Sequence, residues 1–164
     1  MITTGNNLVS PPALLDSHWR GILECAAMEV FSMMVGVDLT PFPEELKEPH
    51  GDRTAMVGLA GALCGMLTIR CSSQMAEKLA TKMLGEDAAA NPSVTGDAMG
   101  ELCNMVAGNF KSKITALADQ CLLSVPTVIW GDDYVIQTIP PHEGFQVALS
   151  LDGEPLWFSL IIHS

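Results

Sequence analysis

Apolar residues recur at intervals of three and four positions in three segments of the chain, and this period predicts amphipathic helices. The first predicted helix runs through residues 18–36, where Asp16 or Ser17 can cap its start and Gly36 can end it. Its mainly apolar face is expected to comprise Ile22, Ala26, Val30 and Met33.

The other two predicted helices also have recognisable boundary residues. The second covers residues 72–85 and lies between a capping serine and a terminating glycine. Its apolar side is expected to comprise Met75, Leu79 and Met83. The third helix begins after Pro92 and continues through residues 96–114. The acidic, alanine-rich residues 86–93 are predicted to form the loop between these two helices.

Elsewhere the apolar residues form continuous or alternating runs, which are typical of strands. Strands are predicted at residues 54–61, 62–71, 127–130, 133–139, 144–152 and 154–162. Gly61 indicates a turn between the first two strands, and Asp152 followed by Gly153 predicts a hairpin between the last two. Residues 38–53 contain three prolines and mixed charge, and they suit a loop or an edge excursion.

This order of elements predicts an α+β fold, with helices on one face of a mainly antiparallel sheet. A length of 164 residues, 48% of them hydrophobic, favours a single domain over residues 1–164. Residues 1–15 are expected to be a flexible N-terminal segment. That segment has no basic region followed by an apolar core, so a secretory signal is not expected.

The balance of charge narrows the classes of partner. The formal net charge is −11, from 8 basic and 19 acidic residues, so the chain has no basic stripe for nucleic acid or anionic lipid. A protein or a small molecule is the expected partner. The five cysteines contain no Cys-x-x-Cys pair, which favours a reduced, cytoplasmic protein. The four histidines show no paired ligand spacing, so no metal site of the protein's own is predicted.

The third helix has a polar row that its packing does not require. Asp97, Glu101, Asn104, Gly108 and Lys111 follow one another at steps of four, three, four and three, which aligns them along one side of a helix. The opposite arc is apolar and is expected to pack on the sheet; it comprises Met99, Leu102, Cys103, Val106 and Phe110. The row can therefore be an ordinary solvated face or a site.

Helix geometry alone favours a solvated face, but two residue types on this side are unusual for one. An asparagine inside a helix costs up to about 0.7 kcal/mol relative to alanine, because its amide competes for backbone hydrogen bonds. Gly100 and Gly108 are expected to flank the same exposed side, and each adds a penalty of up to about 1 kcal/mol. Small residues there would let another protein surface approach the helix closely.

These residues resemble a known family. The pattern Asp97-x-x-x-Glu101-x-x-Asn104, followed by Ala-Gly-Asn at residues 107–109, is similar to the signature of the CheX, CheC and FliY phosphatases of bacterial chemotaxis. The order of elements, up to the Val-Pro-Thr-Val segment at residues 125–128, extends the resemblance over most of the chain. Pro126 stands about one residue short of the spacing of the signature's downstream proline, so it is a weaker match.

The resemblance also indicates a branch of the family. The CheC branch carries two Glu-x-x-Asn helices and the CheX branch one. The first predicted helix here offers only Glu24-x-x-Ala27 and Glu29-x-x-Ser32, so the chain looks like CheX. This resemblance implies a phosphatase that acts on the phosphoaspartate of a CheY-like receiver domain, with Mg²⁺ carried by the receiver. It also implies a homodimer, for which the final strands could supply a pairing edge.

Within the resemblance, Asn104 is expected to orient the attacking water and Glu101 to dock against the receiver's active-site lysine. Asp97 is interpreted as a partner of its own helix's first turn, where a carboxylate stabilises unpaired N–H groups. One alternative is an adaptor that binds a receiver domain or a motor component without hydrolysis. A metal- or nucleophile-based hydrolase is less favoured, because the chain has no G-x-S-x-G, H-E-x-x-H or glycine-rich phosphate loop.

Overall fold

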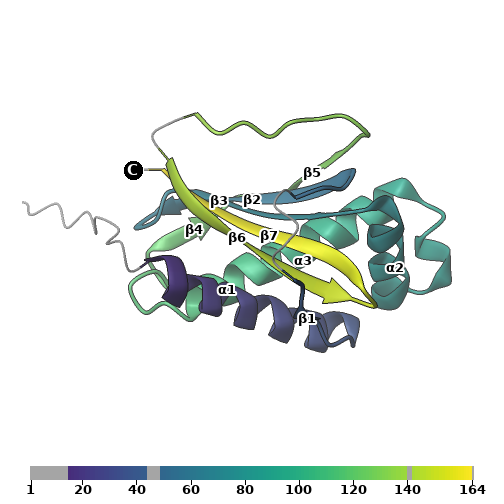
Figure 1. Ribbon diagram of the computed structural model, residues 1–164, viewed down its shortest axis with the longest axis horizontal. Coiled ribbons are helices and arrows are strands. Elements are labelled where there is room, and N and C mark those ends of the chain that lie inside the picture. The colour runs from purple at the N-terminus through teal and green to yellow at the C-terminus, as the bar shows by residue number, and fades with distance from the viewer. Residues whose placement is uncertain (1–14, 44–48, 140–141, 164) are drawn as a thin grey trace, which may run out of the picture.

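The computed structural model describes residues 15–43, 49–139 and 142–163. In this part of the chain, a seven-stranded antiparallel sheet has the strand order β1-β6-β7-β3-β2-β4, and β5 also pairs with β2. Three α-helices cover one face of the sheet (Figure 1). The predicted α+β fold, with helices on one face of an antiparallel sheet, is confirmed.

The elements follow one another in the order that the sequence pattern predicts. The helices are α1 (Leu15–Val30), α2 (Ser73–Leu84) and α3 (Pro92–Ser112), with a π-helical turn η1 (Phe31–Val35) after α1 and a 3-10 turn η2 (Glu86–Ala88) before α3. The strands are β1 (Thr40–Pro41), β2 (Arg53–Gly61), β3 (Gly65–Cys71), β4 (Cys121–Leu123), β5 (Thr127–Trp130), β6 (His142–Leu151) and β7 (Glu154–His163).

The first helix differs from its prediction at both ends. Its described residues start at Leu15, so the expected capping residues Asp16 and Ser17 lie within the helix. The rest of the expected flexible segment, residues 1–14, lies outside the described residues. At the other end, the wider π-turn buries Phe31 and Val35 and leaves Met33 71% exposed. The α-helical period had placed Met33 on the buried face, and the extra residue per turn moves it out.

The second helix matches its prediction closely. The side-chain oxygen of Ser72 accepts a hydrogen bond from the Met75 backbone N–H at 3.1 Å, and Gly85 ends the helix with φ of 100°. Two of the predicted apolar residues, Met75 and Leu79, are buried, and Met83 is partly buried.

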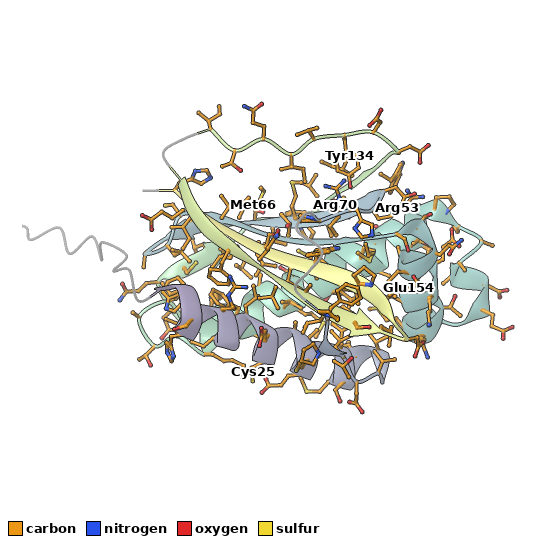
Figure 2. All side chains as sticks on the ribbon, in the orientation of Figure 1. Cys25, Arg53, Met66, Arg70, Tyr134 and Glu154 are labelled. Carbon is orange, nitrogen blue, oxygen red and sulfur yellow. The ribbon has the colours of Figure 1, made fainter. Side chains whose placement is uncertain are left out.

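The sheet confirms most predicted strands and corrects one. Residues 133–139 alternate in exposure but form no strand; their chain runs above the open face of the sheet (Figure 1). Tyr134 anchors this segment (Figure 2), because its hydroxyl lies 2.6 Å from Thr54 Oγ1 and the Arg70 guanidinium lies 4.9 Å from its ring centroid. The segment is therefore held by side-chain contacts to β2 and β3 and not by strand pairing.

Two short strands were not predicted. Strand β1 lies within the proline-rich residues 38–53, where proline is tolerated because the strand is at the sheet edge. Strand β4 pairs with the end of β2 at residues 59–61. The predicted hairpin between β6 and β7 is confirmed, with Asp152 and Gly153 both at positive φ, as a type I′ turn requires.

The core lies between the helices and the sheet. It includes the fully buried side chains of Phe31, Leu67, Phe110 and Phe158. Three of the five cysteines are also buried, namely Cys71, Cys103 and Cys121, and burial raises the pKa of each thiol. In the described ranges, no helix has the length and apolar character needed to cross a membrane.

The buried arc of α3 provides a test of this packing. Val106 and Phe110 are fully buried, so Val106→Asp and Phe110→Asp each place a charge in the core without a partner. Each variant is expected to lose at least about 3 kcal/mol of unfolding free energy, measured by urea denaturation. Glu101→Ala, on the exposed side of the same helix, is the matched control and should remain within about 0.5 kcal/mol of wild type. A Phe110→Asp variant as stable as wild type would contradict the packing.

Candidate functional site

The candidate site is the exposed side of α3. The helix begins at Pro92, where the Asn91 side-chain oxygen accepts a hydrogen bond from the Ser93 N–H at 3.0 Å. The predicted apolar arc is confirmed, because Met99, Leu102, Cys103, Val106 and Phe110 are at most 1% exposed. On the opposite side, Asp97 and Glu101 are exposed and Asn104 is half-buried.

Glu101 and Asn104 are free to meet a partner. Within the part of the chain that the structure describes, neither side chain makes a hydrogen bond or an ion pair. They are three residues apart on one helix, so their side chains lie on the same side within one turn. The helix therefore presents a carboxylate and an amide together, and the fold uses neither.

Asp97 does not have the role expected of it. Because α3 begins at Pro92, Asp97 is in the second turn, and the first turn holds no acidic residue. The unpaired N–H groups that a carboxylate would stabilise belong to the first turn only. The asparagine cap and the N-terminal proline supply that function instead.

Lys111 and Asn109 serve the fold, although both belong to the segment singled out in the sequence. The Lys111 ammonium donates to the backbone carbonyls of Ala118 and Cys121, at 2.8 and 2.9 Å. It thereby ties the end of α3 to the turn that leads into β4. The Asn109 amide donates to the Glu29 carboxylate on α1 at 2.9 Å. Lys111 is therefore engaged by the fold, and the row of unengaged polar side chains is shorter than the predicted line.

The Glu29 carboxylate holds the C-terminal part of α3 against α1. Lys113 donates to Glu29 at 2.7 Å, in addition to the hydrogen bond from Asn109. These hydrogen bonds, that from Lys113 first, lower the pKa of Glu29 to about 2. Glu29 was one of the two glutamates considered for a second Glu-x-x-Asn helix, and here it is occupied by a structural contact.

Gly100 does not flank an exposed surface, as the sequence analysis expected. It is buried, and a Cβ atom at this position would lie 3.2 Å from Pro126 Cβ and 3.6 Å from Val128 Cγ2. The missing side chain lets the protein's own strand β5 approach α3. At Gly108 a Cβ would meet Leu123 Cδ1 at an ordinary 3.9 Å.

The break between β4 and β5 brings Pro126 to the helix. Ser124 replaces regular strand pairing at this point: its N–H donates to the Gly58 carbonyl at 2.9 Å, and its Oγ accepts from the Gly58 N–H at 2.8 Å. The chain then resumes pairing at Thr127, opposite Met56. Pro126 thus lies beside Gly100, one residue before Glu101. Sequence analysis did not identify Ser124, because its role depends on pairing with the distant Gly58.

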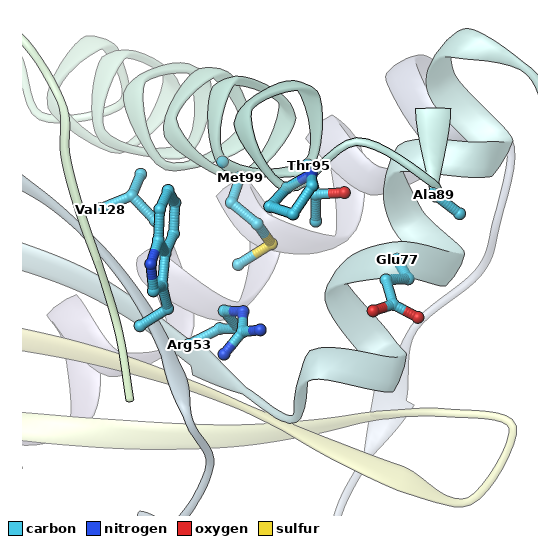
Figure 3. Close-up of a pocket in the computed structure, with 9 residues that line it drawn as sticks. Arg53, Glu77, Ala89, Thr95, Met99 and Val128 are labelled. Carbon is cyan, nitrogen blue, oxygen red and sulfur yellow. The ribbon is translucent and has the colours of Figure 1, made fainter. Parts of the chain in front are cut away.

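A small hollow lies beside the N-terminal half of α3 (Figure 3). It is lined by Arg53, Glu77, Ala89, Pro92, Thr95, Gly96, Met99, Val128 and Trp130. Arg53 and Glu77 lie on opposite sides of it, on β2 and α2. The sequence analysis did not predict this feature. Within residues 15–43, 49–139 and 142–163, no group of three His, Cys, Asp or Glu side chains is placed to hold a metal ion.

Comparison with known proteins assigns the chain to a family. The family model of the chemotaxis phosphatase CheX matches residues 53–150, which is more than half of the chain and includes Glu101 and Asn104. None of the curated proteins matches the chain.

Several solved structures share the fold. CheX from a Desulfovibrio desulfuricans subspecies has 23% identity and a TM-score of 0.77, over 88% of this chain and 99% of that one. CheX from Borrelia burgdorferi, crystallised with CheY, BeF3 and Mg²⁺, has 25% identity and a TM-score of 0.76, over 89% of this chain and 98% of that one.

A more distant structure extends the likeness. FliY from Thermotoga maritima has 17% identity and a TM-score of 0.61, over 89% of this chain and 86% of that one, so the likeness to FliY is one of fold alone. The family model, which covers more than half of the chain, is the stronger finding. The chain belongs to the CheX family of the CheC, CheX and FliY chemotaxis phosphatases.

Proposed function

We propose that this protein hydrolyses the phosphoaspartate of a CheY-like receiver domain, and that Glu101 and Asn104 carry the activity. The observation that supports this most directly is the pair itself. Both side chains lie on the accessible side of a 21-residue helix whose other side is buried, and the fold engages neither of them. A rigid helix with two free polar groups suits a site whose task is positioning.

Asn104 has the chemistry needed to position water. Its side-chain oxygen can accept a hydrogen bond from a water molecule while its amide N–H donates elsewhere, which fixes the water in line with the phosphorus. The amide is neutral, so it can approach the phosphoryl oxygens without electrostatic repulsion. A carboxylate at position 104 would repel them.

Glu101 is the docking residue in this proposal. One turn from Asn104, its carboxylate can pair with the receiver's active-site lysine and set the register between the two proteins. Mg²⁺ is expected on the receiver, which would supply charge neutralisation for the phosphoryl group. The partner is suggested by the Borrelia burgdorferi CheX, which was crystallised in a complex with CheY, BeF3 and Mg²⁺.

The proposal extends to the location and assembly of the protein. Receiver domains are intracellular signalling domains, so the proposal includes a cytoplasmic location. It also includes a homodimer that pairs through a sheet edge, which light scattering of the purified protein would test.

A non-catalytic adaptor is the main alternative, because the same helix could bind a receiver without hydrolysis. The two functions differ in turnover. A phosphatase present at one-hundredth of the receiver concentration would speed the loss of phosphate from the whole receiver pool. An adaptor at that concentration could bind, and so affect, at most one-hundredth of the receiver molecules. Following the phosphorylated receiver over time therefore separates them.

The first prediction of the proposed function concerns Asn104. Asn104→Ala should bind the phosphorylated receiver with nearly wild-type affinity and reduce the accelerated dephosphorylation by about two orders of magnitude or more, because it loses only the positioning group. Its control is the double variant Glu101→Ala plus Asn104→Ala, whose thermal unfolding should match wild type or improve slightly, since alanine favours helix. Full activity in Asn104→Ala would rule out the proposed mechanism.

The second prediction concerns the ion pair at Glu101. Glu101→Lys should weaken receiver binding, because it places two like charges in contact. Reversing the charge of the receiver lysine should restore part of that affinity in Glu101→Lys and weaken binding to wild type, as measured by titration calorimetry with all four pairings. The exposed Asp97→Lys change is a control for net charge. If Asp97→Lys and Glu101→Lys lose equal binding affinity, and the reversed receiver charge restores none of it, Glu101 does not pair with that lysine.

A further inference from the structure

Gly108 is a glycine inside α3 that the backbone conformation does not require. Glycine is among the poorest helix formers, so an interior position usually has a structural or a functional cause. Gly108 is not among the glycines with positive φ, and α3 continues beyond it to Ser112. Neither a left-handed conformation nor a helix end therefore explains this glycine.

Packing within the protein does not explain it either. The other two glycines of α3, Gly96 and Gly100, each lie against a side chain of residues 126–130, where an added Cβ would come within 3.2 Å. At Gly108, the one described atom within 4 Å of an added Cβ is Leu123 Cδ1, at 3.9 Å. That separation is an ordinary van der Waals contact, so the free protein has room for a methyl group at position 108.

The next polar side chains along α3 do not cover Gly108. The Lys111 ammonium is held at the turn before β4 by its hydrogen bonds to the carbonyls of Ala118 and Cys121. The Ser112 hydroxyl donates back to the Gly108 carbonyl at 2.8 Å. Neither the Lys111 nor the Ser112 side chain comes within 4 Å of the place that a Gly108 Cβ would take. The helix backbone at Gly108 is thus only half-buried and open to a partner.

Gly108 also lies on the same side of α3 as the proposed site residues. At 3.6 residues per turn, it is roughly 20° around the helix axis from Glu101 and roughly 40° from Asn104. Along the axis it is about 6 Å from Asn104. The side chain of Asn104 is short, so its amide reaches a phosphoryl group only where the receiver comes close to the α3 backbone. A longer side chain at position 108 would hold the receiver away.

Openness alone does not identify a docking residue. Gly21 of α1 is exposed, and no described atom lies within 4 Å of a Cβ added there. Gly108 differs from Gly21 because it continues the side of a helix on which Glu101 and Asn104 have no partner within the described part of the chain. The combination of an open glycine and two unengaged polar groups on one helix side points to a close approach by a partner.

We propose that Gly108 is a docking residue of the receiver-binding surface, at which a main-chain segment of the receiver domain packs directly on the α3 backbone. The inference rests on the proposed function, because it takes the receiver as the occupant. Gly108 is one helical turn from Asn104, so the contacting segment lies beside the phosphoaspartate of the receiver. The missing side chain sets how closely the receiver docks, and thereby whether Asn104 reaches the attacking water.

The test compares stability with docking in Gly108→Ala and Gly108→Leu. Gly108→Ala should raise the unfolding temperature by up to about 4 °C, because alanine favours helix and fits in the free protein. The Kd for a receiver carrying BeF3 and Mg²⁺, as in the CheY crystallised with the Borrelia burgdorferi CheX, should rise about 10-fold in Gly108→Ala and about 100-fold in Gly108→Leu. Turnover at saturating phosphorylated receiver should also fall in Gly108→Leu, because Asn104 is held away from the phosphorus.

Gly21→Ala is the matched control, since it replaces an open helical glycine on another helix. It should raise the unfolding temperature in the same way and leave the Kd unchanged. A wild-type Kd in Gly108→Leu would overturn the docking role. An unfolding temperature of Gly108→Ala below that of wild type would also overturn it, because the fold would then require the glycine.

These measurements separate the docking role from the proposed function. If Asn104→Ala loses turnover while Gly108→Leu binds and turns over like wild type, the docking role of Gly108 is wrong and the phosphatase proposal stands. If Asn104→Ala keeps full turnover, the phosphatase mechanism is wrong. A raised Kd in Gly108→Leu would then still support the contact at Gly108, in a protein that binds the receiver without this chemistry.

Discussion

The packing of α3 on two of its sides is the constraint on which the rest of this structure depends. Its apolar arc is buried against the core, with Val106 and Phe110 fully inaccessible. A second side is closed by β5, which approaches because Gly96 and Gly100 have no side chains. With two sides fixed, the third cannot rotate or shift without breaking the core. A mechanism that positions a water molecule requires this rigidity, because small displacements of the positioning group are costly.

The sequence was sufficient to predict those elements in which apolar residues recur at one regular interval. The helical period of apolar residues on α3 predicted both its buried arc and the exposure of Glu101. A single rotation of the helix about its axis buries all of the apolar residues and leaves Glu101 in solvent. The sequence was not sufficient where a residue's role depends on a distant segment. The sequence placed Gly100 on the surface, whereas β5 packs beside it. The alternation in residues 133–139 predicted a strand, whereas this segment is held by the contacts of Tyr134 with Thr54 and Arg70. The π-turn that exposes Met33 had no signal at all.

The separation of charge along the helix is consistent with the proposed chemistry. The carboxylate of Glu101 lies one turn from Asn104, so the negative charge is kept away from the position where a phosphoryl group would react. In the proposed complex, a lysine beside the phosphate would give this protein of net charge −11 a cation for Glu101 to meet. The neutral amide of Asn104 would then approach the reacting centre. Exchanging the two residue types would place the repulsive group at that centre and leave the lysine without a counter-ion.

The arrangement also explains how the fold tolerates residues that do not stabilise it. An interior asparagine costs up to about 0.7 kcal/mol and each interior glycine up to about 1 kcal/mol relative to alanine. Burial of one leucine or phenylalanine contributes about 1.5–3 kcal/mol, and α3 buries Leu102 and Phe110 completely. The burial of these core side chains therefore offsets the cost of Asn104 on the exposed side and of Gly96 and Gly100 beside β5. Because the two sides share no side chains, Asn104 can be selected for its chemistry while Val106 and Phe110 maintain the fold.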